Sequence, residues 1–390
     1  MAQVFLLRGA KQMLTLRGPS GARRGAALHD LGVIEDGSIL IRDGTIAAVG
    51  STRRLENLKE ARTAIEIPAN GSVVMPAFID ASLYLNLGVA NGSPEHKRKK
   101  LASFYEESLA LLRACLQHGT LTAEVKANGN SGDFQSDVSV LKQLSNIGNQ
   151  PVGIARTWRI ARQPLSEEPL TPEFRKTLNA ISERKLVQSV EVTPQPGQVL
   201  HEALLTVAGT KNLGVKLHWP GGPAEALATH LARLQPATVC CPCDLSPAEC
   251  QVLARSSSAA VFAPGREIVE NRSGDAIRQL VENGVPIAIG SGYDATQSPT
   301  FSMQMAVALA VLRSRLTVEA AITAATINAA YAVGCGHLRG SLEFGKRADV
   351  LMLNLPDYRE IPRRFGINHV GIAIRDGNLV LNRTRWKIGN

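Results

Sequence analysis

The stretch VVMPAFIDASLY, which spans Val73–Tyr84, decides how this chain folds. Its first half is an apolar run rich in β-branched residues, which is typical of a buried strand. Asp80, Ser82 and Tyr84 then alternate with apolar residues, and side chains two positions apart point to the same side of a strand. The stretch therefore predicts a buried strand with three polar side chains on one face of its end.

Seven further short apolar runs follow, separated by segments with helical spacing. Eight strand–helix units in roughly 260 residues match the size of a TIM barrel. A doubly wound open sheet is the alternative, but no glycine-rich phosphate loop follows an early strand. We therefore predict an α/β fold with a (β/α)8 barrel over residues 73–339. The expected strands are Val73–Ile79, Leu121–Val125, Val152–Ala155, Ser189–Val192, Val215–Leu217, Thr238–Cys240, Ala259–Phe262 and Pro286–Ile289.

Both ends of the chain are rich in strand signals. Residues 1–72 contain short apolar runs around the hairpin signal Arg42-Asp43-Gly44, and residues 340–390 contain a matching turn at Arg375-Asp376-Gly377. A small β-unit of this kind cannot bury both of its faces alone. Residues 1–72 and 340–390 are therefore expected to form one composite β-sandwich domain.

The composition narrows the class of protein. Of the 390 residues, 44% are hydrophobic and 20% are charged, as in soluble globular proteins, and no apolar run approaches the roughly 18 residues that span a membrane. Six cysteines without a framework spacing favour reduced thiols and a cytoplasmic location. The net charge is +9, but basic residues are scattered and aromatics are 4%, so neither nucleic-acid nor membrane binding is expected.

The opening stretch resembles the first barrel strand of the amidohydrolase superfamily, whose pattern is Val-x-Pro-Gly-Phe-Ile-Asp-x-His-x-His. Within it, the chain is most similar to imidazolonepropionase-like proteins, which hydrolyse a cyclic amide, and the resemblance covers most of the chain. The segments that carry it are Leu31–Gly37, Ile41–Gly50, His118–Lys126, Ser298–Met303 and Gly340–Asp349.

The resemblance implies a metal site at the ends of strands one, five, six and eight, and most of its positions are substituted here. Ser82 and Tyr84 stand where the family has two ligand histidines. His218 keeps the strand-five ligand, the strand-six histidine falls near Cys241, and Gly292 aligns with the proton-shuttle aspartate. Hydroxyl groups bind zinc or iron poorly compared with imidazole.

Two ways of rebuilding the centre stay open. His218 with Cys241 and Cys243 would offer a soft nitrogen and sulfur set suited to zinc, although buried cysteines that act as small hydrophobes explain the same residues. Asp294, two residues beyond Gly292, would serve as a substitute base or simply as a loop turn.

Our hypothesis is a catalytically impaired or inactive homologue that keeps its barrel for binding a small ligand or a protein partner. No cofactor is expected, and zinc or iron enters only if the site is rebuilt. A homodimer and pairing with an active paralogue are both left open. The alternative is an active hydrolase of cyclic-amide C–N bonds with a rebuilt or metal-independent site. Its candidate catalytic residues are His218, Asp294 and Glu124, and the expected pocket comprises Ser82, Tyr84, Glu124, Lys126, Trp158, Glu191, His218, Cys241, Gly292 and Asp294.

Overall fold

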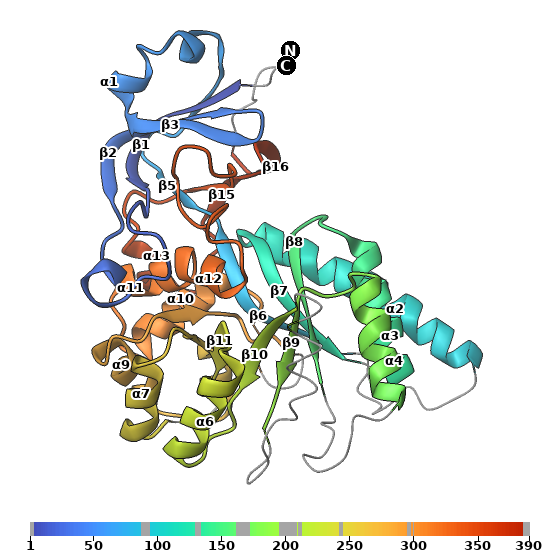
Figure 1. Cartoon of the computed structure of the whole chain (residues 1–390). Coiled ribbons are helices and arrows are strands. Elements are labelled where there is room, and N and C mark those ends of the chain that lie inside the picture. The colour runs from blue at the N-terminus through green and yellow to red at the C-terminus, as the bar shows by residue number, and fades with distance from the viewer. Residues whose placement is uncertain are drawn as a thin grey trace.

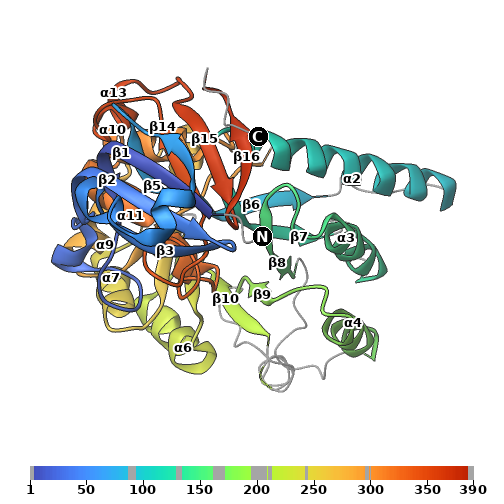
Figure 2. The ribbon, with the colours of Figure 1, turned by 90° about the horizontal axis from the view of Figure 1, so that it is seen from above.

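The computed structural model describes residues 4–86, 94–128, 134–160, 172–194, 209, 213–241, 245–294, 298 and 300–384. A β-rich body lies above an α/β body (Figure 1), and the view from above places strands from both chain ends side by side in the former (Figure 2). No helix in the described ranges is long and apolar enough to cross a membrane.

The lower body is the expected barrel, and the TIM-barrel prediction is confirmed. Eight strands form one sheet in the order β13-β12-β11-β10-β9-β8-β7-β6, and each hydrogen-bonded pair is parallel. Counted from strand one to strand eight of the barrel, they are β6 (Phe78–Asn86), β7 (Thr120–Asn128), β8 (Gly153–Arg159), β9 (Ser189–Val192), β10 (Gly214–His218), β11 (Thr238–Cys240), β12 (Ala259–Phe262) and β13 (Ile287–Ile289).

The barrel closes where the segment after β13 meets β6. The Gly292 amide donates to the Ser82 carbonyl at 2.7 Å, and the Tyr84 amide donates to the Tyr293 carbonyl at 3.0 Å. These two bonds continue the parallel ladder past the end of β13. Strand eight is thereby pressed against the end of strand one, where the active site of a TIM barrel normally lies.

Helices cover the outside of the barrel. In α4, for example, Phe174, Leu178 and Ile181 are buried at helical spacing, so one stripe of the helix faces the strands. The helices are α2 (Pro94–Gln117), α3 (Phe134–Ile147), α4 (Pro172–Glu183), α6 (Ala224–Leu234), α7 (Pro247–Ala254), α8 (Pro264–Val269), α9 (Asp275–Glu282), α10 (Met303–Leu312), α11 (Val318–Ala324) and α12 (Ile327–Ala332).

The upper body is one mixed sheet that both chain ends build. Its order is β16-β15-β14-β5-β1-β2-β3, with β4 paired to β1, and the antiparallel pair of β14 and β5 joins the two halves of the sequence. Its elements are β1 (Val4–Leu14), η1 (Gly25–Leu28), β2 (Val33–Arg42), β3 (Thr45–Ser51), α1 (Thr52–Leu55), η2 (Lys59–Thr63), β4 (Ile65–Pro68), β5 (Val73–Pro76), β14 (Val350–Leu353), α13 (Glu360–Arg363), β15 (Val370–Arg375) and β16 (Asn378–Asn382).

The opening stretch crosses from one body to the other. The sequence predicts one strand over Val73–Ile79, whereas the structure divides it: β5 pairs in the upper sheet and β6 in the barrel. Ala77 is the joint, and its amide donates to the Asp349 carbonyl at 3.0 Å. One apolar segment therefore anchors both bodies, which explains why it is buried along its whole length.

Candidate functional site

The interior of the barrel holds five ionisable side chains, each at most 4% exposed: Asp80, Glu124, Lys126, Glu191 and Lys216. Two buried ion pairs join four of them. The Lys126 ammonium contacts a Glu191 carboxylate oxygen, and the Lys216 ammonium lies 2.7 Å from Glu124 Oε2. Buried charges are stable only when they are paired and hydrogen-bonded, so these pairs hold one another in place.

Glu124 uses both of its carboxylate oxygens. Thr157 donates to Oε1 at 2.6 Å, and Lys216 donates to Oε2 while also bonding the Ala332 carbonyl at 2.9 Å. A general base needs a lone pair within reach of its substrate. The structure thus gives Glu124, one of the expected catalytic candidates, a fully bonded position in the barrel wall.

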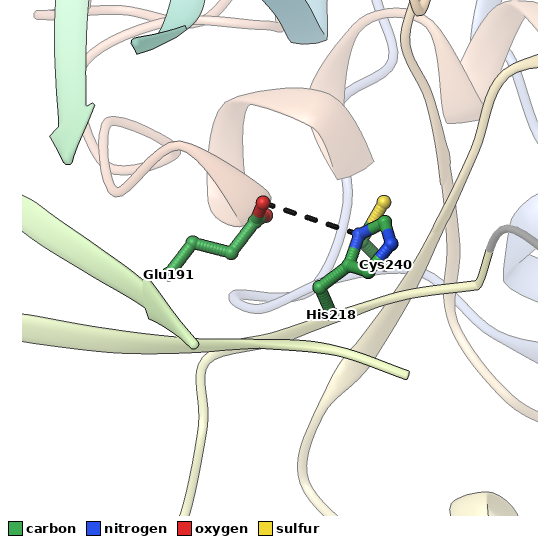
Figure 3. A group of neighbouring side chains, drawn as sticks. All are labelled: Glu191, His218 and Cys240. Carbon is green, nitrogen blue, oxygen red and sulfur yellow. Dashed lines mark ion pairs between the residues drawn. The ribbon is translucent and has the colours of Figure 1, made fainter. Parts of the chain in front are cut away.

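Glu191, His218 and Cys240 meet at the carboxyl ends of β9, β10 and β11 (Figure 3). Their nearest ligand atoms all lie within 4.8 Å of one another, and Glu191 Oε1 is 4.0 Å from His218 Nδ1. Neither of these two buried atoms has a hydrogen-bond partner among the described residues. The strand register places His218 directly beside Cys240.

The protonation states of this cluster follow from burial and charge. Burial would raise the pKa of Glu191, but Lys126 and His218 outweigh it and the pKa is about 2. Burial lowers the pKa of His218 to about 4, so its imidazole is neutral at pH 7. Burial would also lower the pKa of Lys126, yet neighbouring Cys240 and Glu191 hold it well above its usual value. Lys126 and Glu191 are therefore both charged at neutral pH.

Tyr84 fills the space beside this cluster. Its hydroxyl oxygen is 3.7 Å from Cys240 Sγ, and its ring lies 5.6 Å from Lys126 Nζ and 5.4 Å from Arg159 Cζ. Cations at such distances over an aromatic face are attracted by it. Tyr84 belongs to strand one and is 6% exposed. Its side chain contacts residues of strands two, three and six. It therefore acts as a plug at the second ligand position.

Strand eight leaves no space for the family's shuttle aspartate. A Cβ at Gly292, which has φ +61°, would lie 2.3 Å from Ala263 Cβ. The backbone of Asp294, the expected substitute, exchanges hydrogen bonds with that of Ser298 at 3.2 and 3.0 Å. A carboxylate at position 292 would require the end of β12 to move.

Asp80 ties strand one to strand eight. Its Oδ1 accepts from the backbone amides of Ser82 at 3.0 Å and Ser291 at 2.8 Å. Its Oδ2 has no hydrogen-bond partner in the described part of the chain, and burial raises the pKa of this carboxyl to about 6. Asp80 is thus a structural tie that carries little of its charge in mildly acidic solution.

The structure keeps two of the expected site residues, Cys241 and Trp158, out of the cluster around His218. Cys241 lies in the hydrophobic core and its thiol contacts the Val239 carbonyl, so Cys240 takes the place expected for Cys241. Cys243 lies outside the described residues. Trp158 points away from the barrel interior, because its indole N–H donates to Asp137 of α3 at 2.9 Å.

Sequence reasoning missed Arg159 and Thr157, which the alternation of β8 turns inward on either side of Trp158. Arg159 Nε lies 3.7 Å from Glu191 Oε1, with 31% of its side chain exposed. The order polar, apolar, polar at Thr157, Trp158 and Arg159 was the available signal. Apolar side chains of barrel strands pack under the helices, so the polar neighbours of Trp158 should point inward.

A cavity of about 10 Å³, room for about one water molecule, lies among the described residues at this end. Its lining includes Ser82, Tyr84, Cys240, Cys241 and Arg266. The Tyr84 ring and the Cys240 thiol therefore border a very small space.

Comparison with known proteins identifies relatives of the whole chain. A sequence profile described as the Amidohydrolase family matches residues 173–380. The imidazolonepropionase of Geobacillus kaustophilus is 30% identical over 97% of this chain and 98% of its own length. That of Alkaliphilus metalliredigens is 28% identical over 97% and 98%.

Solved structures share the fold. A triazine hydrolase variant superposes with a TM-score of 0.71 at 14% identity, covering all of this chain and 97% of its own. The guanine deaminase of E. coli superposes with a TM-score of 0.67 at 16% identity, covering 98% of this chain and 100% of its own. At these identities the likeness concerns the fold alone.

Breaking the central ion pair should be costly. In Glu191→Gln the Lys126 ammonium loses its carboxylate inside the barrel, so we expect a loss of about 3–5 kcal/mol in the free energy of unfolding. The double variant Lys126→Met/Glu191→Leu, with similar volume and no charge, should recover most of it. Urea denaturation measures both. The control is Glu282→Gln, which breaks an exposed ion pair with Arg278. If Glu191→Gln lowers the free energy of unfolding no more than this control does, the pair of Lys126 and Glu191 does not have the proposed importance.

Asp80 should make stability depend on pH. Its pKa is raised in the folded state from 3.8 to about 6, so the folded chain binds this proton more tightly than the unfolded chain. The resulting stabilisation is present below about pH 4 and is lost as the pH rises through about 6, roughly 3 kcal/mol in all. The difference in unfolding free energy, wild type minus Asp80→Asn, should therefore fall between these pH values. A difference that is flat or rises with pH would refute the shift.

Proposed function

This chain belongs to the amidohydrolase family as an imidazolonepropionase-like member, and from that premise we propose that its barrel binds a small carboxylate-bearing ligand without metal-dependent hydrolysis. One observation carries the proposal: the residues at the positions of the family's metal ligands make other contacts here. Tyr84 packs as a plug, and Gly292 has no space for a side chain.

The residues present do not fit the metal that the family implies. On strand one, Ser82 offers only a buried hydroxyl and Tyr84 a phenol whose pKa is raised by burial. On strand eight, a side chain at position 292 would meet Ala263. Of the ligand set that the resemblance implies, His218 alone keeps its type, and one imidazole does not hold a catalytic metal.

Electrostatics works in the same direction. The Lys126 ammonium already occupies one oxygen of Glu191, the only carboxylate beside His218 in the described cluster. Charges of +2 and +1 about 5 Å apart repel by roughly 7 kcal/mol at an effective dielectric constant of about 20. A divalent ion bound to Glu191 Oε1 would be repelled in this way by the Lys126 ammonium. The ion pair without a metal avoids this repulsion.

The mouth suits an anion. Arg159 and Arg266, with side chains 31% and 20% exposed, come from β8 and α8. Arg266 lines the small cavity with Tyr84 and is already paired with Glu270 at 2.6 Å, so Arg159 is the more available of the two. Guanidinium groups recognise carboxylates through paired N–H donors. The name imidazolonepropionase refers to a propionate, so a carboxylate group is the part of the relatives' substrate that these arginines favour. A protein partner, a homodimer and pairing with an active paralogue stay predictions.

A second candidate function is an active hydrolase with a rebuilt zinc site. It rests on one observation. Glu191 Oε1 and His218 Nδ1 have no hydrogen-bond partner among the described residues, and they lie with Cys240 Sγ within 4.8 Å of one another. Carboxylate, imidazole and thiolate together form a ligand set that zinc accepts, and bound zinc would supply an activated water.

Metal analysis separates the two candidates. Protein purified without chelator should contain no stoichiometric zinc, iron or manganese, and it should not consume imidazolone propionate. It should bind the stable analogue imidazole-4-propionate in calorimetry, and Arg159→Ala should weaken this binding by about tenfold or more. Arg278→Ala, an exposed arginine on α9, is the control.

The opposite outcome is equally clear. About one equivalent of zinc, lost in both His218→Ala and Cys240→Ser, together with turnover of the cyclic amide, would establish the rebuilt site. If the protein contains no metal and does not bind the analogue, the proposed ligand class is wrong.

A further inference from the structure

A larger cavity lies at the other end of the barrel, between its amino-terminal rim and the upper sheet. Its volume is about 530 Å³, within the roughly 300–1,000 Å³ of small-molecule sites. Thr122 and Gly153 line it at the start of β7 and β8, whereas Tyr84 and Cys240 stand at the carboxyl ends of their strands. The cavity is therefore separate from the candidate site described above.

Three arginines face this cavity and share one aspartate. Arg339 is well neutralised, because it contacts Asp349 and lies 2.7 Å from Asp376 Oδ1. Arg347 and Arg375 reach Asp376 only at 3.7 and 3.9 Å, beyond hydrogen-bond length. The cavity thus has two guanidinium groups whose charge is only loosely balanced.

Arg375 is built into the wall of the cavity. It is 6% exposed, its Nη1 donates to the Asn149 carbonyl, and its Nε has no hydrogen-bond partner among the described residues. Gly153 makes room for it, since a Cβ there would lie 3.2 Å from Arg375 Nη2. Burying a guanidinium is costly when its nearest carboxylate lies only at 3.9 Å, and burial lowers the pKa of Arg375 although Asp349 and Asp376 partly offset it.

The remaining lining adds no negative charge. Burial raises the pKa of the Cys335 thiol to about 11, so it is neutral at pH 7. Asn149 and Gln150 supply amide groups, and Ile154 and Val333 supply apolar surface. The cavity therefore combines cationic donors, neutral hydrogen-bonding groups and a small apolar wall.

We propose that this cavity binds a small organic dianion, with Arg347 and Arg375 holding its acidic group. A planar guanidinium with parallel N–H donors matches a carboxylate or a phosphate group, and the ligand would complete the partial neutralisation of both arginines. Arg347 has 48% of its side chain exposed and can reach the ligand from the rim, while Arg375 is fixed below it. The site would give the barrel a second ligand, remote from its mouth.

Calorimetric titration of the full chain at constant ionic strength tests this proposal. Inorganic phosphate and succinate are the two probes, and they distinguish a phosphate ester from a dicarboxylate. We expect one of them to bind, and Arg347→Ala and Arg375→Gln each to weaken that binding by about tenfold or more. Because Arg347 is half-exposed and loosely paired, its variant should remain folded even if Arg375→Gln does not.

Two control variants locate the binding. Arg278→Ala replaces an arginine with a similar exposed fraction, 46%, and should change nothing. Arg159→Ala at the mouth should leave intact the binding that Arg347→Ala weakens, whatever its effect on the mouth ligand. Binding that is lost in Arg159→Ala and kept in Arg347→Ala, or no binding of either probe, would overturn the proposal.

Discussion

The buried pair of Lys126 and Glu191 is the interaction on which the rest of the barrel interior depends. Two charges removed from water need each other, and Glu191 cannot serve a metal and an ammonium group equally well. The neighbouring pair of Lys216 and Glu124 follows the same rule and uses every oxygen of its carboxylate. The carboxylate and ammonium groups of strands two, four and five thus pair with one another inside the barrel.

The substitutions around this pair are physically linked. Tyr84 gives two cations an aromatic face, and its hydroxyl contacts Cys240. Gly290 and Gly292 bring strand eight against strand one, because a Cβ at Gly290 would lie 2.5 Å from the Ser82 amide. In a close-packed interior, replacing one ligand by a larger or smaller group forces its neighbours to adjust. Such coupling would explain why several positions around the pair depart from the family pattern together.

Local patterns were enough to predict the architecture from the sequence. Period-two runs, helical stripes and the two Asp-Gly turns each reflect contacts within a few residues, and the eight predicted strands correspond to strands of the barrel and β5. The site depends on the register of neighbouring strands and on the direction in which each side chain points. Both are set by hydrogen bonds between strands that are far apart in the sequence. Cys240 rather than Cys241 faces His218 because β10 and β11 pair at that register, and Trp158 points outward because β8 alternates around it. The cavity beside Arg375 joins segments more than 200 residues apart, such as Asn149 and Arg375, and no local signal reveals it.

We propose that the ion pair of Lys126 and Glu191 and the aromatic ring of Tyr84 take the place of a metal centre. Crystals of the full chain soaked in zinc, with anomalous diffraction recorded at the zinc absorption edge, test it most directly. We expect no anomalous peak in the barrel interior, and electron density for Lys126 bonded to Glu191. A peak within bonding distance, roughly 2.0–2.3 Å, of Glu191 Oε1, His218 Nδ1 and Cys240 Sγ would contradict it.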